Sequence, residues 1–378
     1  MPFPSLPPEL WLDIVDTIVL SNPSHALRTP ALASLARISR SFYSVANPLL
    51  YRTLFLDTSR RLKILSTLAA RPTLAKEVRN LTISGGEMSV GEFEFTKEVL
   101  SSCSNISSLT YLCFDSWYLP NLTSSIAKTS WSKQLRYLRS DAKEGLFELL
   151  SKLPNLEELV ASRIDFPETS SISMSTSRPS FRLKRFDSGS TPFDSDFFTL
   201  TYSSRETLVD LDFPTSSRSP LPDLSGFPAL SRLTLTLAER YIPHNLDSRI
   251  GVPGGPIRAD RDDIRCLERV KEMLRMIEAG GGGNSFERLE LYQPDYRRTR
   301  EISSNDVKEA GLLEGIPRFV KELDLSTINL EAEYLMEVFG GRSKEGCNGL
   351  RRIWLRKVEQ VKEVDRVLTE RGIAVEWV

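Results

Sequence analysis

The chain begins with apolar residues at helical spacing. Leu10, Ile14 and Val15 fall on one side of a helix, because residues three and four positions apart are neighbours on its surface. Pro8 suits the first turn, where a helix leaves its N–H groups unpaired, and Asn22-Pro23 ends the segment. The pattern predicts a short amphipathic helix over residues 8–21.

A second helical segment follows. Thr29-Pro30 fits a helix start, with a capping residue followed by proline at the first helical position, and Asn47-Pro48 is expected to end the segment. A break is expected near residues 39–41. The apolar residues on its predicted face are Leu32, Leu35, Ile38, Phe42 and Val45. Helices this short cannot form a secure core alone, so we expect them to pack on the rest of the chain or on another protein.

After residue 50 the periodicity changes to a loose L-x-x-L-x-L motif. In a strand, alternate residues point to the same face, so L-x-L places two apolar residues inward and the middle residue outward. Most repeats are 21 to 34 residues apart, with one gap of 56, which is typical of irregular leucine-rich repeats. The predicted strands are 78–83, 109–114, 135–140, 156–161, 183–188, 208–213, 230–235, 286–291, 320–325 and 350–355. Their central residues are Leu81, Leu112, Leu138, Leu159, Phe186, Leu211, Leu233, Leu289, Leu323 and Ile353.

Helical patterns separate these strands, for example at 94–103, 143–154 and 332–341. Strand and helix in alternation predict an α/β solenoid with a parallel sheet and its helices on the other face. The Ser/Thr-rich stretch 167–180 is predicted to be a loop. An insertion at about 240–285, with a helix near its end, accounts for the long gap.

The first 50 residues resemble an F-box. Leu6, Pro7, Glu9, Leu10 and Ile14 match the leading Leu-Pro-x-Glu-Leu and the Ile that follows it. Leu35, Ile38, Arg40 and Phe42 match the second part, although the family usually has Trp where Phe42 stands and the loop between the helices is longer than usual. Leu50-Tyr51 stands at the usual Leu-Trp. The later strands resemble the irregular leucine-rich repeats that often follow an F-box, without the asparagine ladder.

This resemblance implies the substrate-recognition subunit of a Skp–cullin–F-box ubiquitin ligase, with an F-box domain at 1–50 and a repeat domain at 51–378. The helices would bind the Skp adaptor of the cullin ligase core, and the repeats would hold a target protein. Such a protein is not an enzyme; it acts by proximity. The alternative is a leucine-rich-repeat interaction scaffold outside any ligase, with the helices as a cap. The implied adaptor-facing residues are Leu6, Pro7, Leu10, Ile14, Leu35, Ile38 and Phe42.

The outward residues of the late strands are the predicted target surface, because a regular array on a rigid sheet suits binding. Trp354 lies between two arginines, which is the composition of a binding hot spot. The alternative is that the C-terminal segment 373–378 or the insertion covers Trp354 as ordinary packing. The candidate target-binding residues are Glu290, Tyr292, Arg352, Trp354 and Arg356.

The composition mainly argues against certain classes of partner and of functional site. Lys+Arg 49 against Asp+Glu 50 gives a net charge of -1, so no basic field argues for a nucleic-acid or membrane partner. The four cysteines show no disulfide or zinc spacing, which favours an intracellular protein, cytoplasmic or nuclear. His25 and His244 have no triad partners in sequence, the Gly run 280–283 is not a phosphate loop, and no metal or cofactor is expected.

Overall fold

The computed structural model describes most of the chain, and it begins with three helices, α1 (Pro8–Ser21), α2 (His25–Ile38) and α3 (Arg40–Arg52). Leu6, the loop 167–179, the insertion residues 240–258 with His244, and the Gly run 280–283 lie outside the described residues. The described residues are 7–21, 25–84, 89–112, 119–141, 145–161, 180–189, 200–215, 222, 224–237, 259–279, 286–293, 302–340, 349–359 and 361–378.

The break between α2 and α3 is where the sequence predicts it. Ser39 has an extended backbone (φ -156, ψ 165), and its Oγ accepts a hydrogen bond from the N–H of Phe42 at 3.2 Å. Two other helix limits were predicted wrongly. Pro30 lies inside α2 and Pro48 inside α3, since each helix is longer than the proline positions indicated. A proline inside a helix removes one backbone hydrogen bond, and tertiary packing outweighs that cost here.

The sheet has twelve strands in sequential order, β1 to β12, and every recorded strand pair is parallel. All ten predicted strands are present, and the α/β strand–helix solenoid is confirmed. The L-x-x-L-x-L pattern does not predict β1 and β12. The strands are β1 (Thr53–Leu56), β2 (Asn80–Ser84), β3 (Ser108–Leu112), β4 (Tyr137–Ser140), β5 (Glu158–Ala161), β6 (Arg185–Asp187), β7 (Asp210–Thr215), β8 (Arg232–Leu237), β9 (Arg288–Tyr292), β10 (Glu322–Leu325), β11 (Arg352–Leu355) and β12 (Ala374–Trp377).

The register follows the repeated leucines. Leu233 pairs with Leu289 across the insertion, and both are fully buried. One predicted central residue is wrong: Leu81 pairs with Leu109, and Leu112 is only partly buried. In β3 the second inward residue is Tyr111, 3% exposed, so the repeat there reads L-x-Y. Inward apolar side chains therefore set the pairing even where the motif is irregular.

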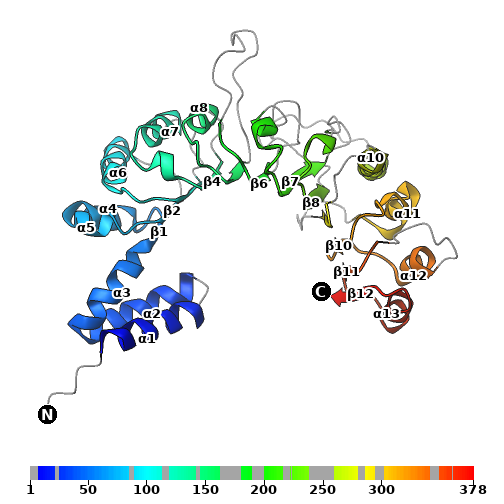
Figure 1. The fold of residues 1–378 in the computed structure, drawn as a ribbon, viewed down its shortest axis with the longest axis horizontal. Coiled ribbons are helices and arrows are strands. Elements are labelled where there is room, and N and C mark those ends of the chain that lie inside the picture. Colours follow the sequence, from blue (N-terminus) through cyan, green and yellow to red (C-terminus); the bar gives the residue numbers. More distant parts are fainter. Residues whose placement is uncertain are drawn as a thin grey trace, which may run out of the picture. The chain divides into compact units, whose positions relative to one another are not determined.

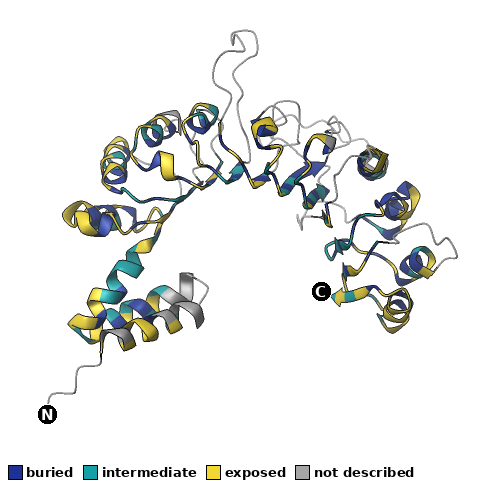
Figure 2. Cartoon of the chain, viewed as in Figure 1, coloured by how far each residue is buried: buried dark blue, intermediate teal, exposed yellow. Residues whose placement is uncertain are grey.

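Helices cover one face of the strands (Figure 1), and both the strands and the helices carry buried residues (Figure 2). The opposite face of the sheet carries the outward residues, and no described helix covers it. The remaining helices are α4 (Arg61–Ala70), α5 (Pro72–Ala75), α6 (Val90–Ser102), α7 (Leu119–Ala127), α8 (Leu146–Leu150), α10 (Ala259–Ala279), α11 (Ser304–Ala310), α12 (Ala332–Gly340) and α13 (Val361–Glu370). Single 3-10 turns are η1 (Ser132–Gln134), η2 (Tyr202–Ser204), η3 (Leu224–Gly226) and η4 (Leu313–Gly315).

The chain forms two compact units. Unit 1 holds α1–α3 and the repeats through β4, and unit 2 holds β5 to β12. The division at residue 50 that the F-box resemblance implies stays a prediction, and no linker marks it. Arg52 ends α3 and Thr53 begins β1, so the three helices continue directly into the first repeat.

Candidate functional site

The three N-terminal helices have a small core of their own. Val15, Leu32, Leu35, Phe42 and Ala46 form it, each 9% exposed or less. Leu35 and Phe42, which were predicted to face the adaptor, are buried in this core in the chain by itself. The reason is the helical spacing itself, because residues that recur every three or four positions first meet the neighbouring helices.

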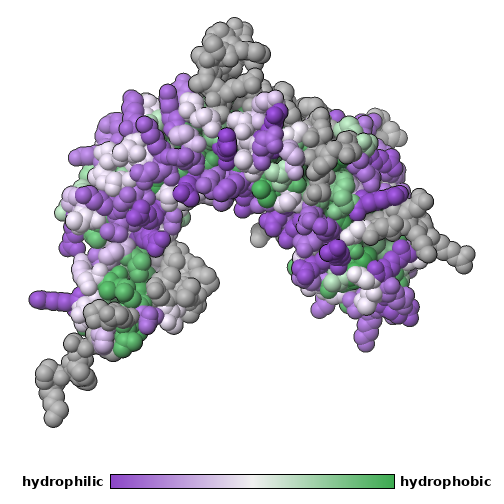
Figure 3. All heavy atoms as spheres, viewed as in Figure 1, coloured by the Kyte–Doolittle hydropathy of each residue, from purple (hydrophilic) through white to green (hydrophobic). Residues whose placement is uncertain are grey.

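Other apolar side chains of the same helices remain exposed. Leu10 is 43% exposed, Ile14 37% and Ile38 66%. Pro7 is exposed too. Figure 3 shows hydrophobic side chains gathered over these helices. Exposed apolar residues grouped on a small unit are typical of a protein-binding surface. Contact of any of these residues with an adaptor stays a prediction.

The second candidate surface is the outward sheet face of unit 2, where Trp354 is half-buried. The indole Nε1 donates a hydrogen bond to Oε2 of Glu376 at 2.7 Å. The guanidinium of Arg288 lies over the ring at 4.7 Å from its centre, and that of Arg352 at 5.6 Å. Glu376 belongs to the C-terminal segment that was one of the two alternatives for covering Trp354. The ring is thus held by its own neighbours, and the residue stays half-buried.

The other predicted target residues share this face. Tyr292, at the end of β9, is 38% exposed, and Glu290 is half-buried two positions earlier. Arg352 and Arg356 are exposed. The register brings Glu290, Asp324 and Trp354 side by side on β9, β10 and β11. Four of the five candidates therefore lie on β9 and β11, on either side of β10, and Arg356 follows directly after β11.

A row of carboxylates on the same face was missed. Asp187 pairs in register with Asp212 on β6 and β7, and Glu290 pairs with Asp324 on β9 and β10. Thr234 on β8 separates the two pairs. The sequence signal was available, because each of these acids lies in the outward position of its strand. Aligned by register, these outward positions show a row that single motifs conceal.

This arrangement changes the acidity of the row. Burial, together with the charges of Asp187 and Glu290, raises the pKa of Asp212 to about 7, against the lowering effect of Arg185. Burial and the charge of Asp324 likewise raise the pKa of Glu290. Arg288 reaches into the row as well: its Nη2 lies 3.4 Å from Oδ2 of Asp324 and 3.9 Å from Oε2 of Glu290. Like charges side by side disfavour ionisation, and the neighbouring arginines offset only part of this repulsion, since the pKa values of Asp212 and Glu290 stay raised.

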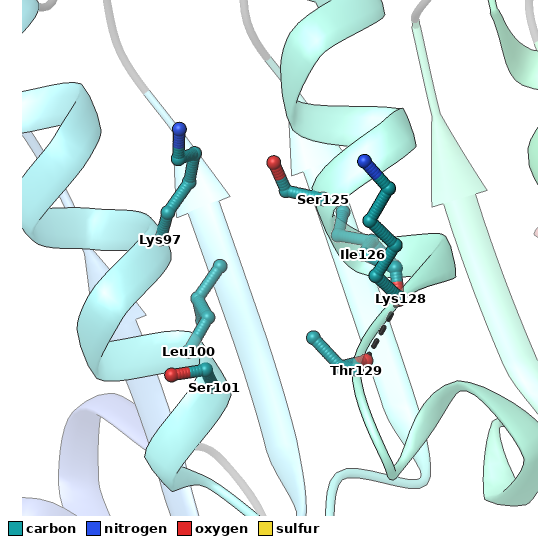
Figure 4. Close-up of a pocket in the computed structure, with 7 residues that line it drawn as sticks. All are labelled: Lys97, Leu100, Ser101, Ser125, Ile126, Lys128 and Thr129. Carbon is teal, nitrogen blue, oxygen red and sulfur yellow. Dashed lines mark hydrogen bonds between the residues drawn. The ribbon is translucent and has the colours of Figure 1, made fainter.

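A pocket lies between α6 and α7 on the helical side of unit 1 (Figure 4). Leu100 and Ile126 are its buried apolar residues. Lys97 is engaged with Glu94 at 2.7 Å, and Oγ1 of Thr129 donates to the carbonyl of Ile126 at 2.7 Å. These polar groups are satisfied within their own helices, so the pocket is a groove between packed helices and presents no group poised for chemistry.

Within the described part of the chain, no group of three or more His, Cys, Asp or Glu side chains could hold a metal ion. The described cysteines, Cys103 and Cys266, are buried and not disulfide-bonded. Burial raises the pKa of Cys103 to about 11, so this thiol stays protonated and is a poor nucleophile. No helix among the described residues is long and apolar enough to span a membrane.

No protein-family model matches the chain, and no curated protein matches it. Among solved structures, a protein from Bacteroides fragilis is similar over 82% of this chain and 68% of its own, at 12% sequence identity and a TM-score of 0.30. A TM-score this low carries no argument about function.

Proposed function

We propose that this protein is the substrate-recognition subunit of a Skp–cullin–F-box ubiquitin ligase. In this proposal α1 and α2 bind the Skp adaptor, and the outward sheet face of unit 2 binds the target protein. The sequence resemblance of residues 6–51 to an F-box supports the adaptor, and the strand–helix repeats after it support a binding module.

The observation that carries the proposal is the exposure of Leu10, Ile14 and Ile38. The helices already have a core, so these side chains are not needed for packing within the chain. Leaving large apolar groups in water has a cost that a partner surface recovers. Buried apolar anchors of this kind are worth about 2 kcal/mol or more each in an interface, or roughly thirtyfold in affinity.

Co-purification with the adaptor tests this proposal. The double change Leu10→Asp and Ile14→Asp should abolish capture and leave the melting temperature unchanged, because both side chains are exposed. Leu12→Asp is the matched control. Leu12 lies on the same helix, is 51% exposed, and faces away from Leu10 by helical periodicity. It should retain capture. Undiminished capture by the double variant, or after deletion of residues 1–50, contradicts the proposal.

The target face has its own test. Trp354→Ala should weaken target capture while the adaptor is still bound. Lost capture at an unchanged melting temperature places the target at Trp354. A fall of many degrees without a separate binding defect means that the indole is structural and the target binds elsewhere.

The second candidate function is a repeat scaffold outside any ligase. The contact between α3 and β1 favours it, since a helix at the end of a solenoid covers an open sheet edge. In that case the Leu10 and Ile14 variants leave all partner binding unchanged.

A further inference from the structure

Arg61, the first residue of α4, is a buried cation with almost no partner. The residue is 1% exposed. Its Nη2 donates one long hydrogen bond, 3.3 Å, to the carbonyl oxygen of Ser84, while Nε and Nη1 have none. A guanidinium cannot lose its proton in a protein, so it cannot avoid the cost of burial by becoming neutral.

The guanidinium lies at the end of the strand that leads into α6. Ser84 is the last residue of β2, the strand that precedes α6, and α4 packs against α6. The charge of Arg61 also reaches Glu92 in the first turn of α6, where it contributes to lowering the pKa of that carboxyl, after hydrogen bonds from Ser89. The carboxyl end of a parallel strand, next to a helix N-terminus, is a common place for anions to bind.

The first turn of α6 retains donors of its own. Ser89 Oγ accepts from the N–H of Glu92 at 3.3 Å, and Glu92 Oε2 accepts from the N–H of Ser89 at 2.9 Å. This capping box leaves the N–H groups of Val90 and Gly91 without a bond to any described residue. A side chain added at Gly91 would meet nothing within 4 Å, so this side of the turn is open.

We propose that Arg61 and the N-terminus of α6 bind a small inorganic oxyanion of the phosphate class. The anion neutralises the buried guanidinium and accepts hydrogen bonds from Nε and Nη1. A water molecule could accept the same hydrogen bonds but could not neutralise the charge. The enclosure of Arg61 favours a free ion over a phosphate carried on a larger molecule. Glu92 is the one carboxylate in the helix's first turn, and its charge opposes the anion. This inference does not depend on the proposed function.

The experiment measures the melting temperature of the full chain in inorganic phosphate at pH 7, against chloride at the same ionic strength. For the wild type we expect a saturable rise of roughly 2–4 °C. Arg61→Met keeps the apolar stem, loses the charge, and should not respond. Arg60→Met removes the exposed neighbouring arginine and should respond as the wild type does. Equal responses of the wild type and Arg61→Met would overturn the proposal, as would no response at all.

Two further arms keep the test decisive if Arg61→Met does not fold. Glu92→Gln preserves the capping hydrogen bonds and removes the opposing charge, so the phosphate response should increase. An unchanged response counts against the site. Glycerol 2-phosphate carries the same charge on a larger body and should stabilise the wild type less than inorganic phosphate does. An equal effect contradicts an enclosed site.

Discussion

Strands β1 to β4 contain no carboxylate side chain, whereas β5 to β12 contain eight. The outward positions of unit 1 are filled by hydroxyl, amide and aromatic groups with one arginine and one leucine: examples are Thr82, Thr110, Tyr137 and Arg139. Those of unit 2 carry the row of Asp187, Asp212, Glu290 and Asp324. The inward positions are alike in the two units, and both bury leucines and aromatic residues there.

The fold restricts the inward residues of the strands and leaves the outward residues free to vary. Inward residues decide register and stability, so they are restricted to apolar types in both units. Outward residues face no helix and can change type at little cost to the fold. Differences in partner recognition between the units therefore reside in the outward rows.

The largest expected effect concerns the buried inward leucines, which the two units share. Leu323 in β10 and Leu109 in β3 are both fully buried. Leu323→Asp and Leu109→Asp should each destabilise their unit by about 4 kcal/mol or more, because each buries an uncompensated charge. Urea unfolding measures the loss. Glu322→Gln, on the outward face next to Leu323, is the control and should change stability by at most about 0.5 kcal/mol. A wild-type unfolding midpoint for either leucine variant contradicts the inward assignment.

A smaller effect tests the difference between the faces. Thr234→Asp fills the gap in the carboxylate row, between Asp212 and Glu290, and should cost about 1–2 kcal/mol at pH 8 beyond the loss of strand propensity. Thr110→Asp is the matched change in unit 1, where Thr82 and Arg139 are the register partners. The propensity change is the same in both, so the difference in unfolding free energy reports the unlike charges of the two faces, the attraction of Arg139 in unit 1 included. Equal losses would show that the two faces are electrostatically alike.

The last effect is a gain in stability. The pKa of Asp212 is raised to about 7 in the folded protein from an ordinary 3.8, so between these values the folded state holds a proton that the unfolded chain has lost. Stability therefore falls as pH rises from about 4 to about 7. Asp212→Asn removes this penalty and should raise stability by at least about 1 kcal/mol at pH 8, because one pKa unit is worth about 1.4 kcal/mol, with the gain vanishing near pH 4.

Asp365→Asn, the same substitution at an exposed position of α13 away from the row, is the control for that measurement. A gain for Asp212→Asn that is equal at pH 4 and pH 8 contradicts the raised pKa.

The fold could be predicted from the sequence to the extent that apolar spacing determines it. The ten L-x-x-L-x-L segments became strands because inward leucines fix both face and register. β1 was missed because Thr53–Leu56 follows a helix without a turn signal, and β12 because Ala374–Trp377 has no third apolar position to complete the motif. Pro30 and Pro48 misled the helix limits, since local propensity yields to packing.

The candidate sites were predictable only in part. Helical spacing identifies Leu35 and Ile38 as apolar neighbours, but only the packing of α1 to α3 separates the buried Leu35 from the exposed Ile38. The contact of Arg288 with Trp354 joins β9 to β11, which lie more than 60 residues apart in sequence, so motif analysis could not find it. Arg61 reads as an ordinary surface residue at the start of a helix until its burial is known.

The direct junction of α3 and β1 has a mechanical consequence. The N–H of Arg79, before β2, donates to the carbonyl of Arg52 at 3.0 Å, and Nη1 of Arg71 donates to the hydroxyl of Tyr43 at 3.0 Å. A free spacer of three residues would let its ends wander by roughly 10 Å. No spacer separates Arg52 from Thr53, and the two hydrogen bonds connect α3 to the first repeats. A partner that binds α1 to α3 therefore also fixes the orientation of the first strands relative to itself.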